Sequence, residues 1–262
     1  MNILDQIVAA KRDEIAAAKC RLPLAACRTA AAVAPRDRRD FAAALRAPGV
    51  RIIAEIKRAS PSQGDIAPGL DPAAVARAYA AGGAAALSVL TEPAFFKGSS
   101  DDLRTARASV SIPVLRKDFI IDSYQLYESA ALGADAVLLI VRILPDPLLA
   151  DLHAMARDLG LAVLTEVFDA EDARRANAVG ATLVGINNRN LASFDTDVSR
   201  AASLAALIRP EAVVIALSGI ATADDIRRNL AAGITRFLVG ETLVRAPDPE
   251  TQLREWNLIR DP

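Results

Sequence analysis

Alanine-rich helical stretches alternate along the chain with short runs of apolar residues. Repeatedly, a helical stretch ends in glycine and an apolar run follows at once, as in AYAAGGAAALSVLTE (78–92) and AVGATLVGINN (178–188). Glycine ends a helix readily because it adopts the left-handed backbone conformation without a Cβ clash. The apolar runs are continuous rather than alternating, which is typical of strands covered on both faces, as in a parallel sheet.

Eight apolar runs are present, and a plausible helix follows each of them. The predicted strands begin near Arg51, Ala85, Pro113, Asp135, Leu161, Thr182, Ala212 and Thr235. The predicted helices include residues 71–82, 123–133, 145–160, 169–180 and 222–233. Eight βα units over about 200 residues favour an α/β fold of the closed (β/α)8 type, the TIM barrel. An open doubly wound sheet is the alternative, since strand order cannot be read from the sequence.

The first fifty residues stand outside this repeat. Residues 3–19 predict an amphipathic helix, with isoleucine or leucine at positions 3, 4, 7 and 15 and charged residues between them. A second helical stretch, residues 41–47, leads into the first strand. Because no low-complexity linker follows, we expect 1–50 to be a helical extension that plugs one end of the barrel. A partner-binding arm is the less favoured alternative, and residues 1–262 are expected to form a single domain.

Composition excludes several classes of protein. Of the 262 residues, 52% are hydrophobic, which suffices for a large core, and 31 basic residues nearly balance 32 acidic ones. This balance gives no reason to expect a nucleic-acid or anionic-membrane partner. The chain begins without a signal-peptide pattern, and no apolar stretch approaches the roughly 20 residues that span a bilayer. We therefore expect a cytoplasmic protein, and a monomer is the simplest expectation.

The cysteines and the histidine offer little catalytic potential. Cys20 and Cys27 are not spaced as a metal or disulfide motif and are expected to be ordinary thiols. The only histidine, His153, falls inside a predicted helix, far from any strand end, and is expected to have a packing or surface role. No metal-ligand cluster and no nucleotide-binding glycine motif is present in the sequence. Acid–base chemistry would then rest on lysine and glutamate, without a metal or cofactor.

Polar residues gather where the predicted strands end, which is where the active site of a barrel lies. These residues are Glu55 and Lys57, Lys117 and Asp118, Glu166, Asn187 to Arg189, Ser218 and Gly219, and Gly240 and Glu241. Each one alone could be a solvated loop residue, and Glu55 and Lys57 could be a structural ion pair. Their convergence on one rim predicts a binding or catalytic site. The glycines after strands seven and eight, with the following helix N-termini, predict a phosphate site.

Several segments resemble those of the indole-3-glycerol phosphate synthase family, in the same order and over essentially the whole chain. They are EIKRASPSQG (55–64), LSVLTEPAFFKGSSDDL (87–103), PVLRKDFIID (113–122), GADAVLLI (133–140), LTEV (164–167), GINNRNL (185–191), and SGI with FLVGE (218–241). The resemblance implies conversion of 1-(2-carboxyphenylamino)-1-deoxyribulose 5-phosphate to indole-3-glycerol phosphate, with loss of CO2 and water. The partner it implies is thus a small phosphosugar.

The resemblance also implies roles for individual residues. Lys117 matches the family's general acid and Glu166 its catalytic glutamate. The implied catalytic set is Lys117, Glu166, Lys57, Glu55 and Asn187; the implied substrate-binding set is Ser60, Phe119, Leu138 and Arg189; and the implied phosphate site is Lys57, Ser218, Gly219, Gly240 and Glu241. How Lys57, Lys117, Glu55 and Glu166 divide the acid and base steps stays open at this point.

One position departs from the family pattern. The family usually reads E-S-G-I after strand seven, and Leu217 stands here in place of that glutamate. We hypothesise that this carboxylate is auxiliary and that its absence alters the rate or pH profile. Two alternatives follow: an aminoaldose–ketose isomerase such as phosphoribosylanthranilate isomerase, disfavoured by the lysines at the strand ends, and a non-catalytic phosphosugar-binding protein, suggested only by Leu217.

Overall fold

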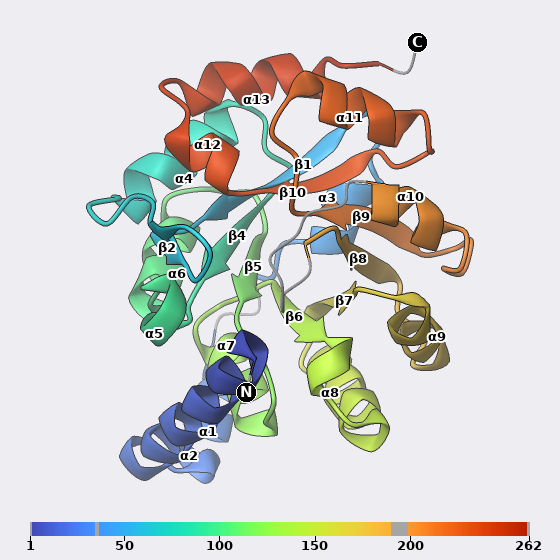
Figure 1. Cartoon of the computed structure of the whole chain (residues 1–262). Helices are drawn as coiled ribbons and strands as arrows, with labels where there is room; N and C mark the ends of the chain where they lie inside the picture. The colour runs from blue at the N-terminus through green and yellow to red at the C-terminus, as the bar shows by residue number, and fades with distance from the viewer. Residues whose placement is uncertain (1, 35–36, 190–198, 261–262) are drawn as a thin grey trace.

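Eight parallel strands close into a barrel in a computed structural model that describes residues 2–34, 37–189 and 199–260 (Figure 1). The strands are β1 (Arg51–Ile56), β4 (Ala86–Leu90), β5 (Val114–Lys117), β6 (Ala136–Ile140), β7 (Ala162–Val167), β8 (Leu183–Asn187), β9 (Val213–Leu217) and β10 (Arg236–Val239). Each predicted start is correct to within one residue. The order β1-β10-β9-β8-β7-β6-β5-β4 confirms the (β/α)8 barrel over the open sheet. Asn190 and Leu191, which end the segment GINNRNL, lie outside the described residues.

Helices surround the barrel, as Figure 1 shows. They are α1 (Ile3–Arg21), α2 (Leu24–Val33), α3 (Phe41–Arg46), α4 (Pro72–Ala81), α5 (Pro93–Phe96), α6 (Ser100–Ala108), α7 (Ser123–Ala131), η1 (Val141–Ile143), α8 (Asp146–Asp158), α9 (Ala170–Ala178), α10 (Ser199–Ala205), α11 (Ala223–Leu230), α12 (Glu241–Arg245) and α13 (Pro249–Asn257). The side chains of Asp71, Asp122, Asp169 and Thr222 cap the predicted helices that follow strands. No helix in the described part of the chain is long and apolar enough to cross a bilayer.

The hydrophobic core of the barrel has two layers. One lies between the strands and the outer helices, and the other fills the barrel interior, where Ile53, Leu115, Leu138 and Leu164 pack together. His153 is buried on α8, and burial lowers the pKa of its imidazole, which agrees with a packing role.

The N-terminal extension plugs the barrel with only one of its three helices. In α3, Phe41 and Leu45 are buried and join the interior core layer at the amino ends of the strands. The guanidinium of Arg236 donates to the carbonyl of Leu45 and holds α3 there. Helices α1 and α2 instead pack against α7 (Figure 1). The first turns of α1 reach the carboxyl end of the barrel, where Ile3, Leu4 and Ile7 lie. The expectation that the extension as a whole plugs one end of the barrel was therefore wrong.

A short hairpin follows β1 and was not predicted. Strand β2 (Ala59–Ser60) pairs antiparallel with β3 (Gly64–Asp65), and the two form a separate small sheet. Gly64 has a φ of 63°, a conformation that favours glycine at this tight turn. The hairpin brings Ser60 and Ser62 to the carboxyl end of the barrel, beside the site described next.

Candidate active site

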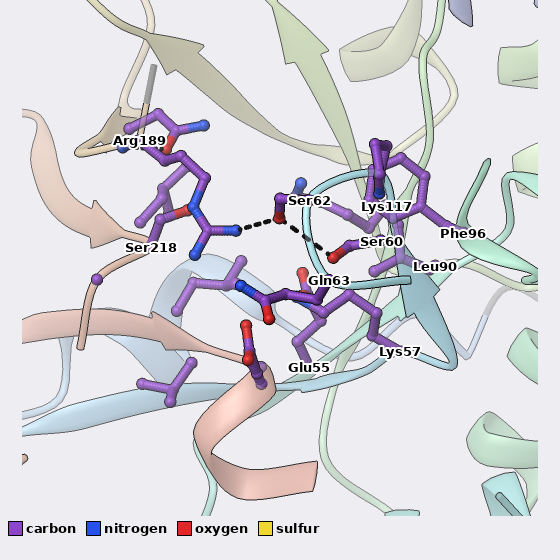
Figure 2. Close-up of a pocket in the computed structure, with 18 of the residues that line it drawn as sticks. Glu55, Lys57, Ser60, Ser62, Gln63, Leu90, Phe96, Lys117, Arg189 and Ser218 are labelled. Carbon is purple, nitrogen blue, oxygen red and sulfur yellow. Dashed lines mark hydrogen bonds and ion pairs between the residues drawn. The ribbon is translucent and has the colours of Figure 1, made fainter. Parts of the chain in front are cut away.

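A cavity of about 560 Å3 opens at the carboxyl ends of the barrel strands. It is lined by twelve of the thirteen predicted site residues: Glu55, Lys57, Ser60, Lys117, Phe119, Glu166, Asn187, Arg189, Ser218, Gly219, Gly240 and Glu241. These residues come from six strands and the loops that follow them, so only the closed barrel brings them together. Figure 2 shows several of them around the space they enclose.

The thirteenth residue, Leu138, does not line this cavity. It lies on β6 with 1% of its surface exposed and packs in the barrel interior. Ile140, two residues further along the same strand, lines the cavity instead. Alternate residues of a strand face the same side, so the prediction chose the correct face of β6 but a position one layer too deep.

Lys117, Glu166 and Asn187 form the first polar group of the cavity. Asn187 at the end of β8 donates from Nδ2 to Glu166 Oε1 at 3.0 Å. The other carboxylate oxygen of Glu166, Oε2, is buried without a hydrogen-bond partner among the described residues, and it lies 3.9 Å from Nζ of Lys117. Glu166 is therefore held by one oxygen, while the other can accept a proton or a hydrogen bond from a bound molecule.

Glu55 and Lys57 form a second ammonium–carboxylate pair, 3.0 Å apart, at the end of β1. Burial alone would raise the pKa of Glu55, but the charges of Lys57 and Lys117 outweigh it and lower that pKa. Glu55 is therefore ionised at neutral pH and holds Lys57 in position. The carboxylate also lies against Gly240, where an added Cβ would come within 2.4 Å of Oε1. Gly240 is needed here because no side chain fits between β10 and Glu55.

A chain of hydrogen bonds links the hairpin to β8 across the cavity mouth (Figure 2). Arg189 donates from Nη1 to the hydroxyl of Ser62 at 3.1 Å, and that hydroxyl lies 3.4 Å from the hydroxyl of Ser60. The backbone N–H of Arg189 donates to Oδ1 of Asn187. Arg189 is thereby fixed at both its backbone and its guanidinium. Ser62 was absent from the predicted site, since a serine in a loop gives no sequence signal of this contact.

The predicted phosphate end is built from two backbone loops. Ser218 and Gly219 have φ values of 66° and 77°, and this left-handed turn follows β9 directly. The N–H groups of Ala221 and Thr222 are already bound by the Asp225 carboxylate, which removes the start of α11 as a free anion site. Helix α12 begins after Gly240 without a side-chain cap. The backbone segments that can still bind an anion are therefore residues 218–219 and 240–241.

The remaining wall of the cavity is apolar and comes partly from the N-terminal helix. Ile3, Leu4 and Ile7 of α1 line the cavity, together with Phe96 and Phe119. The two phenylalanine rings are 5.9 Å apart between centroids. The sequence identified Phe119 but not the three α1 residues, which looked like the packing face of an ordinary amphipathic helix. Their apolar spacing was visible, but which element they cover was not.

Two further residues, Asn188 and Leu217, lie at the ends of strands. Asn188 is fully buried and donates to the carbonyl of Ser218, so its role is structural rather than in the cavity. Leu217 lines the cavity with 2% of its surface exposed, and its side chain covers Gly185. An apolar side chain thus occupies the place where the family resemblance implies a carboxylate. No metal-binding group of three or more His, Cys, Asp or Glu residues is found within the described ranges.

The closed barrel and the polar cavity at its carboxyl ends define an enzyme of the (β/α)8-barrel class. A family model described as indole-3-glycerol phosphate synthase matches residues 4–256. The chain belongs to that family and is accordingly a carboxy-lyase of tryptophan biosynthesis. The alternatives of an isomerase and of a non-catalytic binding protein are therefore rejected.

Relatives with the same description cover nearly the whole chain. The indole-3-glycerol phosphate synthase of Desulfosudis oleivorans is 51% identical over 259 residues, which cover 97% of this chain and 98% of the relative. That of Albidiferax ferrireducens is 50% identical and covers 97% of both chains. That of Burkholderia ambifaria is 48% identical, covering 96% of this chain and 97% of the relative.

Two solved structures share the fold at low sequence identity. Thiamine phosphate pyrophosphorylase from Pyrococcus furiosus has a TM-score of 0.60 at 18% identity and covers 79% of this chain and 93% of its own. 3-Hexulose-6-phosphate synthase from Salmonella typhimurium has a TM-score of 0.63 at 13% identity and covers 79% and 96%. At these identities the likeness extends to the barrel architecture alone.

Proposed function

We propose that this enzyme converts 1-(2-carboxyphenylamino)-1-deoxy-D-ribulose 5-phosphate to indole-3-glycerol phosphate, CO2 and water by lysine and glutamate acid–base catalysis. The observation that carries the proposal is the pair Lys117 and Glu166, 3.9 Å apart in a cavity between an apolar wall and two glycine loops. The apolar wall suits an aromatic ring, and the backbone loops suit a phosphate. The family membership supports this substrate.

Ring closure joins the carboxylate-bearing carbon of the aromatic ring to the ketone carbon of the sugar. The ketone oxygen gains a proton or a hydrogen bond as the new bond forms, and we assign that donation to the ammonium of Lys117. Lys117 suits this step because it lies at the rigid end of β5. Its ammonium is 3.9 Å from the Glu166 carboxylate, so no short ion pair ties it up. The carboxylate then leaves as CO2, and its bonding electrons restore the aromatic ring.

Dehydration completes the indole. The hydroxyl formed from the ketone departs as water after protonation, and a base removes a proton as the double bond forms. We assign the base to Glu166, whose Oε2 has no hydrogen-bond partner among the described residues and whose Oε1 is fixed by Asn187. Glu55 is less suited, because its lowered pKa makes it a weak base and it is already paired with Lys57.

We assign Lys57 to the phosphate end of the substrate. Its partner Glu55 lies against Gly240, next to the backbone loop that is open to an anion, so the ammonium is held on that side of the cavity. Arg189 and the hydroxyl of Ser60 would contact the polar middle of the substrate. The two lysines thus serve different ends of one molecule in this proposal.

The test is to supply the purified protein with this substrate and to follow indole fluorescence together with CO2 release. Turnover by the wild type and its loss in Lys117→Ala are expected. Lys97→Ala is the matched control, because Lys97 is about half-exposed and its only ion pair among the described residues, to Asp65, lies outside the cavity. No turnover by the wild type would refute the proposal. Turnover that is equal in Lys117→Ala and Lys97→Ala would refute the role of Lys117.

A further inference from the structure

The buried face of α1 carries a lysine between two isoleucines. Ile7, Lys11 and Ile15 follow one another at intervals of four residues, so they lie on one side of the helix. The side chain of Lys11 is only 1% exposed. A buried ammonium without a partner would strongly destabilise the fold. Its partners are Glu14 on the same helix and Asp118 on the barrel, with Nζ 2.8 Å from Asp118 Oδ1.

Asp118 is fully buried and uses both of its carboxylate oxygens. Oδ1 accepts from Lys11 and from the backbone N–H of Phe119, and Oδ2 accepts from the guanidinium of Arg116 and the hydroxyl of Thr91. Burial opposes ionisation, but the charges of Arg116 and Lys11 lower the pKa of Asp118 to about 2. Burial would likewise lower the pKa of Lys11, yet Asp118 raises it. Both members of the pair are therefore charged at neutral pH.

This ion pair joins two walls of the cavity. Asp118 stands between Lys117 and Phe119 in the chain, and both of these neighbours line the cavity. On α1, Ile7 lies one turn before Lys11 and Ile3 lies two turns before it, and both line the cavity as well. A displacement of either member would therefore change the distance between the apolar wall and the strand end that carries the acid.

We propose that Lys11 is a positioning residue of the active site, which fixes the first turns of α1 against the strand end that bears Lys117 and Phe119. Lys11 does not line the cavity and acts through Asp118. The inference rests on the proposed function, because the bound molecule it serves is the substrate proposed above. A residue that only docks α1 on the barrel would not change substrate affinity more than another docking contact of the same helix does. The inference predicts that the loss of Lys11 lowers substrate affinity and that the loss of such another contact does not.

The chain supplies a matched control on the same helix. Lys19 pairs with Asp122 at 2.6 Å, and it also ties α1 to the segment around α7, but it is partly exposed and away from the cavity. We expect Lys11→Met to raise KM about tenfold and to lower kcat by a smaller factor. The reason is that displacement of α1 relative to the end of β5 weakens the binding of the substrate between them. Lys19→Met, with the same loss of charge, is expected to leave KM and kcat within about twofold, since exposed pairs contribute little. Both variants are measured well below their Tm values, with circular dichroism to verify the fold.

Each result decides the inference. Equal KM values in Lys11→Met and Lys19→Met would overturn it. If Lys11→Met does not fold, Lys11→Gln, which keeps an N–H donor toward Asp118, is compared with Lys19→Gln in the same way. If the wild type shows no turnover, the proposed function fails and hydrogen exchange decides the inference. Exchange at residues 6–10 at least tenfold faster in the Lys11 variant than in the Lys19 variant would support it, and equal rates would overturn it.

Discussion

Glu166 and Asn187 share a hydrogen bond of 3.0 Å that leaves the other, buried oxygen of the carboxylate without such a partner among the described residues. The bond fixes the orientation of Glu166 at a barrel end, where the strands themselves are rigid. Nζ of Lys117 lies 3.9 Å from the second oxygen, so the carboxylate is oriented but not neutralised by a short contact. A base held in this way needs little reorganisation when it takes a proton.

Replacement of Glu166 by glutamine should therefore abolish proton transfer while it preserves the contact to Asn187. We expect Glu166→Gln to lower kcat by about 10^2- to 10^4-fold with a small change in KM, the usual size of a general acid–base contribution. Glu171→Gln is the control, since Glu171 is an exposed residue of α9 that pairs with Arg174. A kcat of Glu166→Gln within tenfold of the control would contradict the assignment. Steady-state kinetics on the proposed substrate measure both variants.

A second prediction concerns Gly240 and the phosphate end. An added Cβ would come within 2.4 Å of Glu55 Oε1, so Gly240→Ala must displace Glu55 and with it Lys57. We expect KM to rise by about tenfold or more and inhibition by inorganic phosphate to weaken in parallel, because a misplaced cation costs binding. Gly69→Ala is the control, since no atom lies within 4 Å of its added Cβ. Phosphate inhibition that stays unchanged in Gly240→Ala would show that this loop is not the anion site.

Much of the barrel could be predicted because its signals are local. A glycine after a helix and an unbroken apolar run after the glycine mark five of the eight βα units, and the apolar run alone marks the other three. Every barrel-strand start was found to within one residue. The polar strand ends were found for the same reason, since the carboxyl ends of parallel strands meet at one rim. Twelve of thirteen predicted site residues accordingly line one cavity.

The residues that were missed depend on contacts between distant parts of the chain. Lys11 interrupts the apolar face of α1, which signals a buried partner, but Asp118 is more than a hundred positions away. The depth of Leu138 in the barrel depends on how the strands are staggered, and no local pattern records the stagger. The α1 side chains at the cavity mouth were missed because the sequence does not show which element that helix covers.

A third prediction uses the titration of Asp118. Its pKa is lowered to about 2 from an ordinary value of 3.8, so the ionised carboxylate stabilises the fold fully above pH 3.8. This contribution is lost as the pH falls toward 2. We expect the stability difference between the wild type and Asp118→Asn to shrink by about 1 kcal/mol between pH 5 and pH 3. Urea unfolding measures it, with the exposed Asp151→Asn as control. A difference that is constant over this range would contradict the lowered pKa.

Leu217 offers the last test, at the position where the family resemblance implies a glutamate. Its side chain lines the cavity, is 2% exposed and covers Gly185, so a glutamate introduced here would be desolvated beside the acid–base residues. Desolvation raises the pKa of a carboxyl group, which would then titrate near the working pH. We therefore expect Leu217→Glu to change the acid limb of the pH profile of kcat/KM, with a loss of stability of about 1–3 kcal/mol. Leu217→Gln has nearly the same shape and should lose stability without the change in profile. Identical pH profiles for Leu217→Glu, Leu217→Gln and the wild type would show that this position does not tune catalysis and that the leucine is a neutral replacement.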